Sequence, residues 1–126
     1  MVVGANTILS IDDSKAVHAF LNSSCADSPF KLVHALSAKE GLEILRAGLS
    51  QIILILLDWE MPEQNGPEAY AEIRRISPVI PVIMVTSKNR PEDIQKMLGN
   101  GVSEYVMKPF TPDILLSKIA TVLEGV

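Results

Sequence analysis

The stretch Ile52-Ile-Leu-Ile-Leu-Leu57 is a run of six apolar residues that is followed directly by an aspartate, Asp58. A continuous apolar run of this length is typical of a strand that is buried on both faces of a parallel sheet. A second run, Thr7-Ile-Leu-Ser-Ile11, is followed by two more aspartates, Asp12 and Asp13. Because ligands of open α/β sheets bind at the carboxyl ends of the strands, we expect the three aspartates to meet there.

The three aspartates indicate a metal site. Carboxylates that are brought together repel one another unless a cation lies between them. Ligation by oxygen alone suits Mg2+, which usually keeps several waters and takes one or two carboxylates from the protein. We expect Asp13, Asp58 and a backbone carbonyl near Glu60 as ligands, in a magnesium-assisted phosphate site at the carboxyl edge of the sheet.

Strand-like runs alternate with segments of helical period along the rest of the chain. Further strands are expected at residues 30–36, 82–85 and 104–107, and the third strand at 52–57. Helices are expected to begin after Ser14 and Ser37, at Gly66-Pro67 and Pro91, and from Thr111. These five β-α units predict one domain, residues 1–126, with a flavodoxin-like, doubly wound α/β fold: a five-stranded parallel sheet of order 2-1-3-4-5 and five helices.

Composition excludes several classes of function. The net charge is −4 and no run of Lys or Arg occurs, so a nucleic-acid footprint is missing. The longest apolar run has six residues, far short of the roughly 20 that a membrane helix needs. Cys25 has no internal disulfide partner, which fits a reducing cytoplasm. The loop after the first strand lacks a G-x-G-x-x-G motif and the Ser/Thr/Gly-rich phosphate loop of flavin binding.

The predicted strand order also brings Thr86 and Lys108 to the edge where the aspartates lie. Phosphoryl transfer to a carboxylate mostly needs positioning and neutralisation of charge. Asp58 is the expected nucleophile, while Lys108 can pair with one phosphoryl oxygen and the hydroxyl of Thr86 can donate to another. A metal-dependent phosphohydrolase is the enzymatic alternative, but the adjacent Asp12-Asp13 pair does not match its usual spacing.

Four motifs carry a family resemblance, in the same order and spacing along the chain. They are Ile8-Leu-Ser-Ile-Asp-Asp-Ser14, Leu57-Asp-Trp-Glu-Met-Pro62 with Asn65-Gly66, Val82-Ile-Met-Val-Thr-Ser87, and Tyr105-Val-Met-Lys-Pro-Phe110. The chain resembles the response-regulator receiver domains of two-component signalling, most closely the single-domain CheY-like type. Such a protein is a signalling switch that catalyses only its own phosphorylation and dephosphorylation.

The resemblance implies a role for each residue of the site. Asp58 would accept a phosphoryl group from a sensor histidine kinase or a phosphotransfer protein. Asp12 and Asp13 match the acidic pair that binds Mg2+, and Lys108 matches the lysine of the motif. Pro109 would follow a cis peptide bond, a geometry that is common only before proline.

The resemblance also implies a switch and an output face. Thr86 would swing toward the phosphoryl group, and Tyr105 would move inward behind it. The expected protein-binding face includes Arg90, Lys96, Met97, Tyr105 and Lys118. Its downstream target is not specified by the sequence, and the protein would be a monomer or a phosphorylation-dependent dimer.

Three alternatives use the same fold. The domain could be a phosphorelay carrier that passes the group from Asp58 to a histidine of another protein. It could be the receiver part of a longer regulator with a separate output domain. A phosphorylation-independent scaffold is disfavoured, since no residue of the acceptor site is missing.

Four further residues have predicted environments. Glu60 and Lys88 could pair across the mouth of the site and so slow hydrolysis of the phosphoryl group; the alternative is a solvated pair of almost no effect. His18 and His34 are expected to be structural and to lie away from the acidic cluster.

Overall fold

The structure, a computed structural model, describes residues 6–61 and 65–124. Strands and helices alternate throughout this part of the chain. Pro62, which ends one of the four motifs, lies outside the described residues, as do positions 1–5 and 125–126 of the predicted domain.

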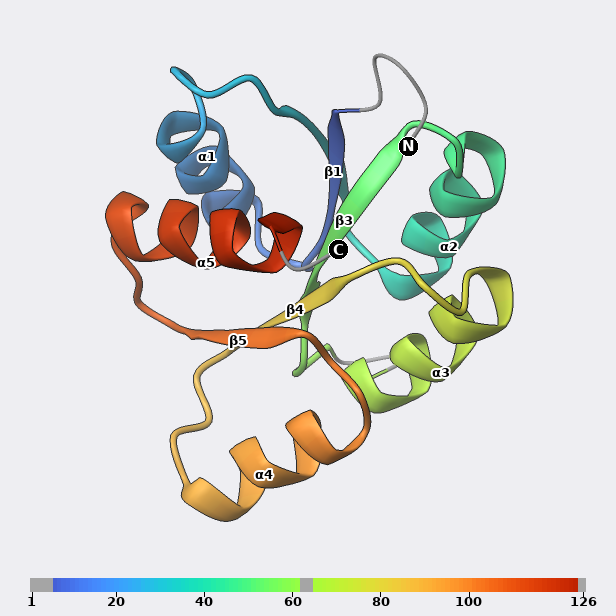
Figure 1. Cartoon of the computed structure of the whole chain (residues 1–126), viewed down its shortest axis with the longest axis vertical. Helices are drawn as coiled ribbons and strands as arrows, with labels where there is room; N and C mark the ends of the chain where they lie inside the picture. Colours follow the sequence, from blue (N-terminus) through green and yellow to red (C-terminus); the bar gives the residue numbers. More distant parts are fainter. Residues whose placement is uncertain (1–5, 62–64, 125–126) are drawn as a thin grey trace.

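Five parallel strands form one sheet in the order β2-β1-β3-β4-β5, which confirms the predicted order (Figure 1). The strands are β1 Thr7–Ile11, β2 Lys31–Ala35, β3 Ile52–Asp58, β4 Val82–Thr86 and β5 Glu104–Met107. β3 and β4 each extend one residue beyond the prediction, because Asp58 pairs with Val85 and Thr86 pairs with Met107. Two polar residues of the predicted site therefore belong to the sheet itself.

Helices cover both faces of the sheet, as Figure 1 shows. α1 (Lys15–Ser24) and α5 (Pro112–Glu124) lie on one face, and α2 (Ala38–Gly48), α3 (Gly66–Ile76) and α4 (Pro91–Gly99) lie on the other. Leu21 of α1 and Leu115 of α5 belong to the first core, and Leu45 of α2 and Ile73 of α3 belong to the second. Burial of each such side chain stabilises the fold by about 1.5–3 kcal/mol. Because helices cover both faces of the sheet, successive strand residues are buried on alternate faces, which explains the continuous apolar runs of the strands.

Side-chain caps begin four of the helices at the carboxyl edge of the sheet. The hydroxyls of Ser14, Ser37 and Thr111 each accept a hydrogen bond from the backbone N–H three residues later, at 3.1–3.2 Å. These predicted starts are confirmed. Asn65 caps α3 in the same way, at 3.1 Å, whereas α4 begins at Pro91 without a side-chain cap. The helix N-termini therefore point their free N–H groups toward the edge that carries the aspartates.

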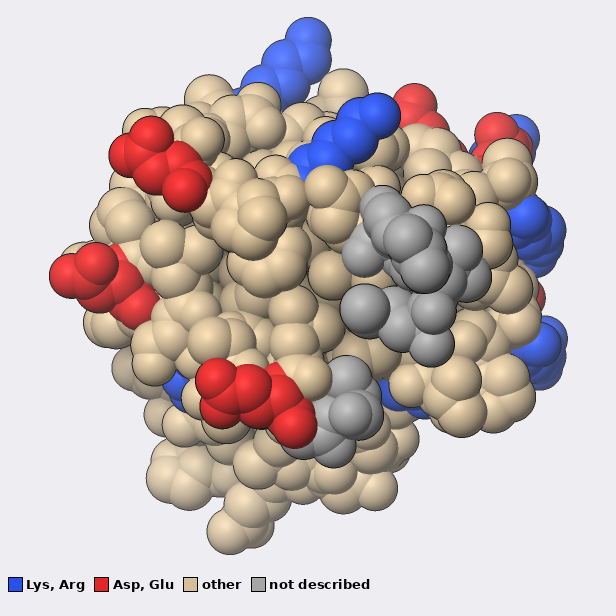
Figure 2. Space-filling model, turned by 45° about the horizontal axis from the view of Figure 1, so that its top comes forward, with Lys and Arg blue, Asp and Glu red and all other residues tan. Residues whose placement is uncertain are grey.

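The opposite, amino edge of the sheet comes forward in Figure 2, where charged side chains are scattered over a largely uncharged surface. A groove at this edge is lined mainly by apolar side chains, among them Phe30, Leu49, Val79 and Leu123. No helix within residues 6–61 and 65–124 is long and apolar enough to cross a membrane.

Candidate functional site

The carboxyl edge of the sheet brings the three aspartates together. Asp12 follows β1 and Asp58 ends β3, and their backbones stay in the sheet pattern, since Asp12 N–H donates to the carbonyl of Ala35 at 3.1 Å. Asp12 is 2% exposed and Asp58 is 3% exposed, whereas Asp13 is exposed to solvent. One carboxylate oxygen of each aspartate lies within 4.8 Å of the other two. The expected meeting place is observed, while the roles of the three residues remain predictions.

Lys108 enters the same site from the end of β5. Its N–H donates to the carbonyl of Thr86 at 2.8 Å, and the peptide bond to Pro109 is cis, as expected from the resemblance. The Lys108 Nζ lies 3.0 Å from Asp12 Oδ2 and 3.5 Å from Asp58 Oδ1. This single ammonium group therefore faces two buried carboxylates, and it neutralises only part of their charge.

Burial shapes the protonation of these groups. Removal from water raises the pKa of Asp58; the neighbouring Asp12 raises it further, and the Glu60 N–H and Lys108 offset only part of the rise. Burial alone would lower the pKa of Lys108, but the hydrogen bond and charge of Asp12, together with Asp58, raise it above its ordinary value. Lys108 is therefore held as a cation, and the charge on Asp58 is costly without a further cation.

Backbone groups orient both buried carboxylates. Ser14 N–H donates to Asp12 Oδ1 at 2.9 Å, and Glu60 N–H donates to Asp58 Oδ1 at 3.1 Å. Asp12 Oδ2 is buried and accepts no hydrogen bond apart from its ion pair with Lys108. Within the described residues, no hydrogen bond or ion pair engages Asp58 Oδ2. One oxygen of Asp58 is thus held in place and the other is left available.

The donor set fits Mg2+. Three carboxylates converge while one ammonium group balances them, and the convergent atoms are all oxygens, the ligands that Mg2+ prefers. The buried Asp12 Oδ2 has Lys108 as its one partner within the described residues, so a metal cation at the cluster would give this oxygen a second. The expected fourth ligand, the Glu60 carbonyl, belongs to the residue whose N–H holds Asp58.

Thr86 lies at the end of β4 and is fully buried. Its hydroxyl donates to Glu60 Oε1 at 2.8 Å and accepts the Lys88 N–H at 3.0 Å. Ser87 adds two hydrogen bonds to Glu60: its hydroxyl lies 2.9 Å from Oε2, and its N–H lies 3.3 Å from Oε1. Burial would raise the pKa of Glu60, but the hydrogen bonds from Thr86 and Ser87, with the charge of Lys88, hold it below its ordinary value.

Of the two alternatives for Glu60 and Lys88, the ion pair across the mouth of the site is wrong for this structure. Glu60 has no ion pair among the described residues, because its carboxylate turns toward the hydroxyls of Thr86 and Ser87 instead. Charge opposition in the sequence predicted a long-range pair, whereas the hydroxyls that follow β4 offer closer donors. Sequence reasoning missed Ser87 as a neighbour of the site, although it directly follows Thr86.

His18 also lies closer to the site than expected. Its Nε2 is 2.7 Å from the backbone carbonyl oxygen of Asp12 and 3.1 Å from that of Ala35. The prediction that His18 lies away from the acidic cluster is therefore wrong, because α1 turns this residue inward beside Leu21, three positions later. That helical spacing was the signal in the sequence. His34, half-buried on β2, hydrogen-bonds Asn22 at 2.8 Å and contacts the His18 ring.

The predicted binding face is only partly a surface. Met97 is fully buried in the core beneath α4, so its inclusion was wrong; the helix turns it toward the sheet. Tyr105 is half-buried, and Lys118 Nζ lies 4.5 Å from the centroid of its ring. The same Lys118 Nζ pairs with Glu104 at 3.2 Å. Lys96 is exposed.

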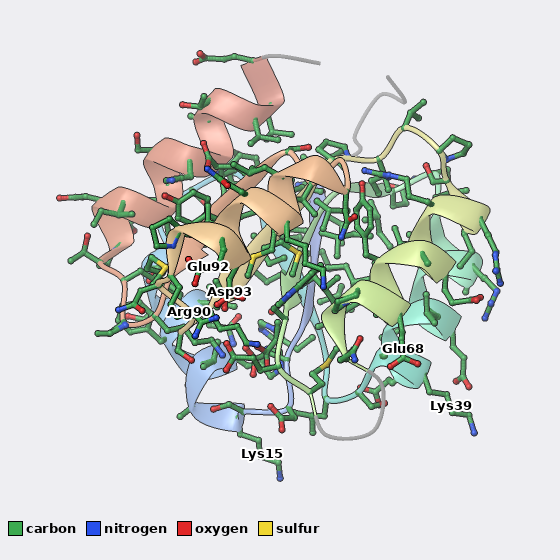
Figure 3. The ribbon with its side chains drawn as sticks, turned by 90° about the horizontal axis from the view of Figure 1, so that it is seen from below. Lys15, Lys39, Glu68, Arg90, Glu92 and Asp93 are labelled. Atoms are coloured by element: carbon green, nitrogen blue, oxygen red, sulfur yellow. The ribbon has the colours of Figure 1, made fainter. Side chains whose placement is uncertain are left out.

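Arg90 lies at the start of α4, where Figure 3 shows it beside Glu92 and Asp93. Its Nε lies 3.1 Å from Glu92 and 3.5 Å from Asp93. Lys15 points away from the ribbon at the start of α1 in the same view. The exposed charges around this edge are therefore paired locally or solvated, whereas those of Asp12, Asp58 and Lys108 are confined within it.

The chain is similar in sequence to known proteins. The family described as response regulator receiver domain matches residues 8–120. Chemotaxis protein CheY1 of Helicobacter pylori is 33% identical over 121 residues, which cover 92% of this chain and 95% of that protein. A two-component response regulator of Oryza sativa subsp. japonica is 34% identical over 116 residues; the match covers 84% of this chain, which spans about half the length of that relative.

A solved structure shares the fold. The CheX–CheY–BeF3–Mg2+ complex from Borrelia burgdorferi contains a chain that superposes with a TM-score of 0.87 at 20% identity, covering 93% of this chain and 88% of that one. With the family match and the CheY relative, this chain belongs to the response-regulator receiver domains of two-component signalling. Domains of this family are signalling switches rather than classical enzymes.

Proposed function

We propose that Asp58 is the phosphoacceptor of this receiver domain and that phosphorylation depends on Mg2+. The carrying observation is the state of the Asp58 carboxylate: Oδ1 is held by Glu60 N–H and Lys108, while no described residue engages Oδ2. A carboxylate oriented through one oxygen presents the other as a nucleophile. The donor would be a phosphohistidine of a sensor kinase or phosphotransfer protein.

The transfer exchanges one bond for another. Asp58 Oδ2 forms a bond to phosphorus, the P–N bond of the phosphohistidine breaks, and the electron pair of that bond returns to the imidazole of the donor. Lys108 lies 3.5 Å from Asp58 Oδ1, within reach of an oxygen of the incoming group. Mg2+, held by Asp12, Asp13, Asp58 and the Glu60 carbonyl, would neutralise charge on the phosphoryl oxygens.

The phosphorylated form would act by a shift of population. Thr86 and Tyr105 would reorient, and the surface around α4, β5 and α5 would then favour a different protein partner. In this conformation Lys118 lies over the Tyr105 ring and pairs with Glu104. Movement of Tyr105 would therefore have to break contacts of this surface, which supports coupling between the site and the partner-binding face.

The test is intact mass after incubation with phosphoramidate and Mg2+. The wild-type chain is expected to gain one phosphoryl group, and Asp58→Asn is expected to gain none. Asp27→Asn, the same change at an exposed aspartate outside the site, is the matched control and is expected to be modified like wild type. An adduct that persists in Asp58→Asn, or that forms equally with a chelator present, would contradict the proposal.

A further inference from the structure

The carboxylate of Glu60 accepts hydrogen bonds from the donors that a phosphoryl group on Asp58 would need. Thr86 Oγ1 donates to Glu60 Oε1 at 2.8 Å, and Ser87 donates both its hydroxyl and its N–H to the same carboxylate. Glu60 is an exposed residue, yet its carboxylate reaches the hydroxyl of the fully buried Thr86. An anion from the chain itself thus occupies the donors at the end of β4.

The hydrogen-bonding capacity of Thr86 makes this occupation exclusive. A threonine hydroxyl has one hydrogen to donate, and here Glu60 receives it. The same oxygen already accepts the Lys88 N–H at 3.0 Å. Thr86 cannot donate to a phosphoryl oxygen while it donates to Glu60.

The backbone of Thr86 leaves side-chain rotation as the available movement. Thr86 pairs with Met107 of β5, and the Thr86 carbonyl accepts the Lys108 N–H at 2.8 Å. The hydroxyl can therefore reorient by rotation of the side chain, which breaks the contact to Glu60 and leaves the sheet intact.

We propose that Glu60 is an internal competitor of the phosphoryl group: it holds Thr86 in the resting orientation and must be displaced when Asp58 is phosphorylated. This inference rests on the proposed function. Two forces separate Thr86 from Glu60 in the phosphorylated protein, since the phosphoryl group attracts the Thr86 hydroxyl and repels the Glu60 carboxylate. Glu60 is thus a positioning residue that sets how readily the switch turns on.

Affinity for beryllium fluoride, added with Mg2+ as a phosphoryl mimic, measures this competition. Trp59 is the one tryptophan of the chain and directly follows Asp58, so we expect its fluorescence to report binding. A hydrogen bond to a charged group corresponds to roughly a ten- to hundredfold change in an equilibrium constant. Glu60→Ala is therefore expected to bind the mimic roughly tenfold more tightly than wild type, and Glu60→Gln, which keeps an acceptor oxygen, to lie between the two.

Removal of Glu60 also removes a negative charge near an incoming anion, so the charge effect must be separated from the hydrogen bond. The Thr86→Ala variant lacks the hydroxyl that Glu60 holds. Introduced into Thr86→Ala, the Glu60→Ala change is expected to lose most of its effect on affinity. Glu43→Ala removes an exposed acid of α2 and is expected to leave the affinity unchanged.

A second readout needs no ligand. Side-chain NMR couplings of Thr86 are expected to show one rotamer in wild type and averaging between rotamers in Glu60→Ala. An equal gain in affinity with and without the Thr86 hydroxyl, or an unchanged Thr86 rotamer, would overturn the inference and leave the proposed function intact. Failure of the wild-type chain to bind beryllium fluoride and to accept a phosphoryl group would overturn both.

Discussion

The carboxyl and amino edges of the sheet are formed by the same strands but have opposite chemistry. At the carboxyl edge Asp12 and Asp58 are almost completely buried and share one cation, Lys108. At the amino edge apolar side chains line a groove, and Val79 is 83% exposed. Buried charge is unfavourable unless it is paired, whereas exposed apolar groups cost little. The comparison shows that, among the described residues, the buried carboxylates lie at one edge of the sheet.

We expect the largest effect at the carboxyl edge from a substitution of Gly66. An added Cβ would lie 2.6 Å from Trp59 Cα and closer still to the indole, so the loop next to Asp58 would have to move. We expect Gly66→Ala to destabilise the fold by about 3 kcal/mol and to impair phosphorylation. Urea unfolding measures the first effect and intact mass the second.

Gly99, at the end of α4, provides the matched control. Nothing lies within 4 Å of a Cβ added there, so Gly99→Ala is expected to be neutral or slightly stabilising. Equal effects of the two substitutions would show that the loop after β3 is as tolerant as an exposed helix end.

Lys108 tests the balance of charge within the carboxyl edge. Lys108→Met would leave Asp12 and Asp58 without their ammonium partner, and we expect a loss of about 2 kcal/mol in the free energy of unfolding. Added Mg2+ should recover part of this loss, because it supplies the missing positive charge. A loss that Mg2+ leaves unchanged would show that the three aspartates do not bind the ion.

Asp58→Asn is expected to stabilise the protein when no Mg2+ is present. Burial raises the pKa of Asp58, so ionisation opposes folding above its ordinary pKa of 3.8, and the full cost is present once the pH exceeds the folded-state pKa. A neutral amide removes this cost, with an expected gain of about 1 kcal/mol at pH 7.

Thermal unfolding of Asp58→Asn with and without Mg2+ measures this gain. The gain should shrink when Mg2+ is added, because only wild type retains the full set of carboxylates. Asp27→Asn, near the amino edge, should change little in either condition. A lower stability of Asp58→Asn than of wild type would contradict the inference that the buried charge of Asp58 destabilises the fold.

We expect the smallest effect on stability at His34. Burial, and then the charge of His18, lowers its pKa, so the fold favours the neutral ring. Its contribution to stability is complete above the ordinary pKa of 6.5 and is lost as the pH falls below that value. Unfolding of His34→Gln from pH 8 to pH 5 should show a weaker pH dependence than wild type, and identical profiles would exclude this contribution.

Much of the fold could be predicted from local patterns. The run before Asp58 is apolar at every position because helices cover both faces of β3, and Ser14 and Ser37 are helix caps by local chemistry. Met97 and His18 were misplaced because the direction in which a helix turns depends on its packing. Glu60 was misassigned because its competing donors come from another strand.

The sequence by itself determined the succession of strands and helices, the family and the three aspartates that end two apolar runs, because these depend on neighbours along the chain. Only the tertiary structure decided that Lys108 lies between Asp12 and Asp58, and that Glu60 receives the single hydrogen of Thr86. Hydrogen bonds and ion pairs depend on distances of a few ångströms between residues far apart in the chain. Those distances exist only once β1, β3, β4 and β5 lie side by side.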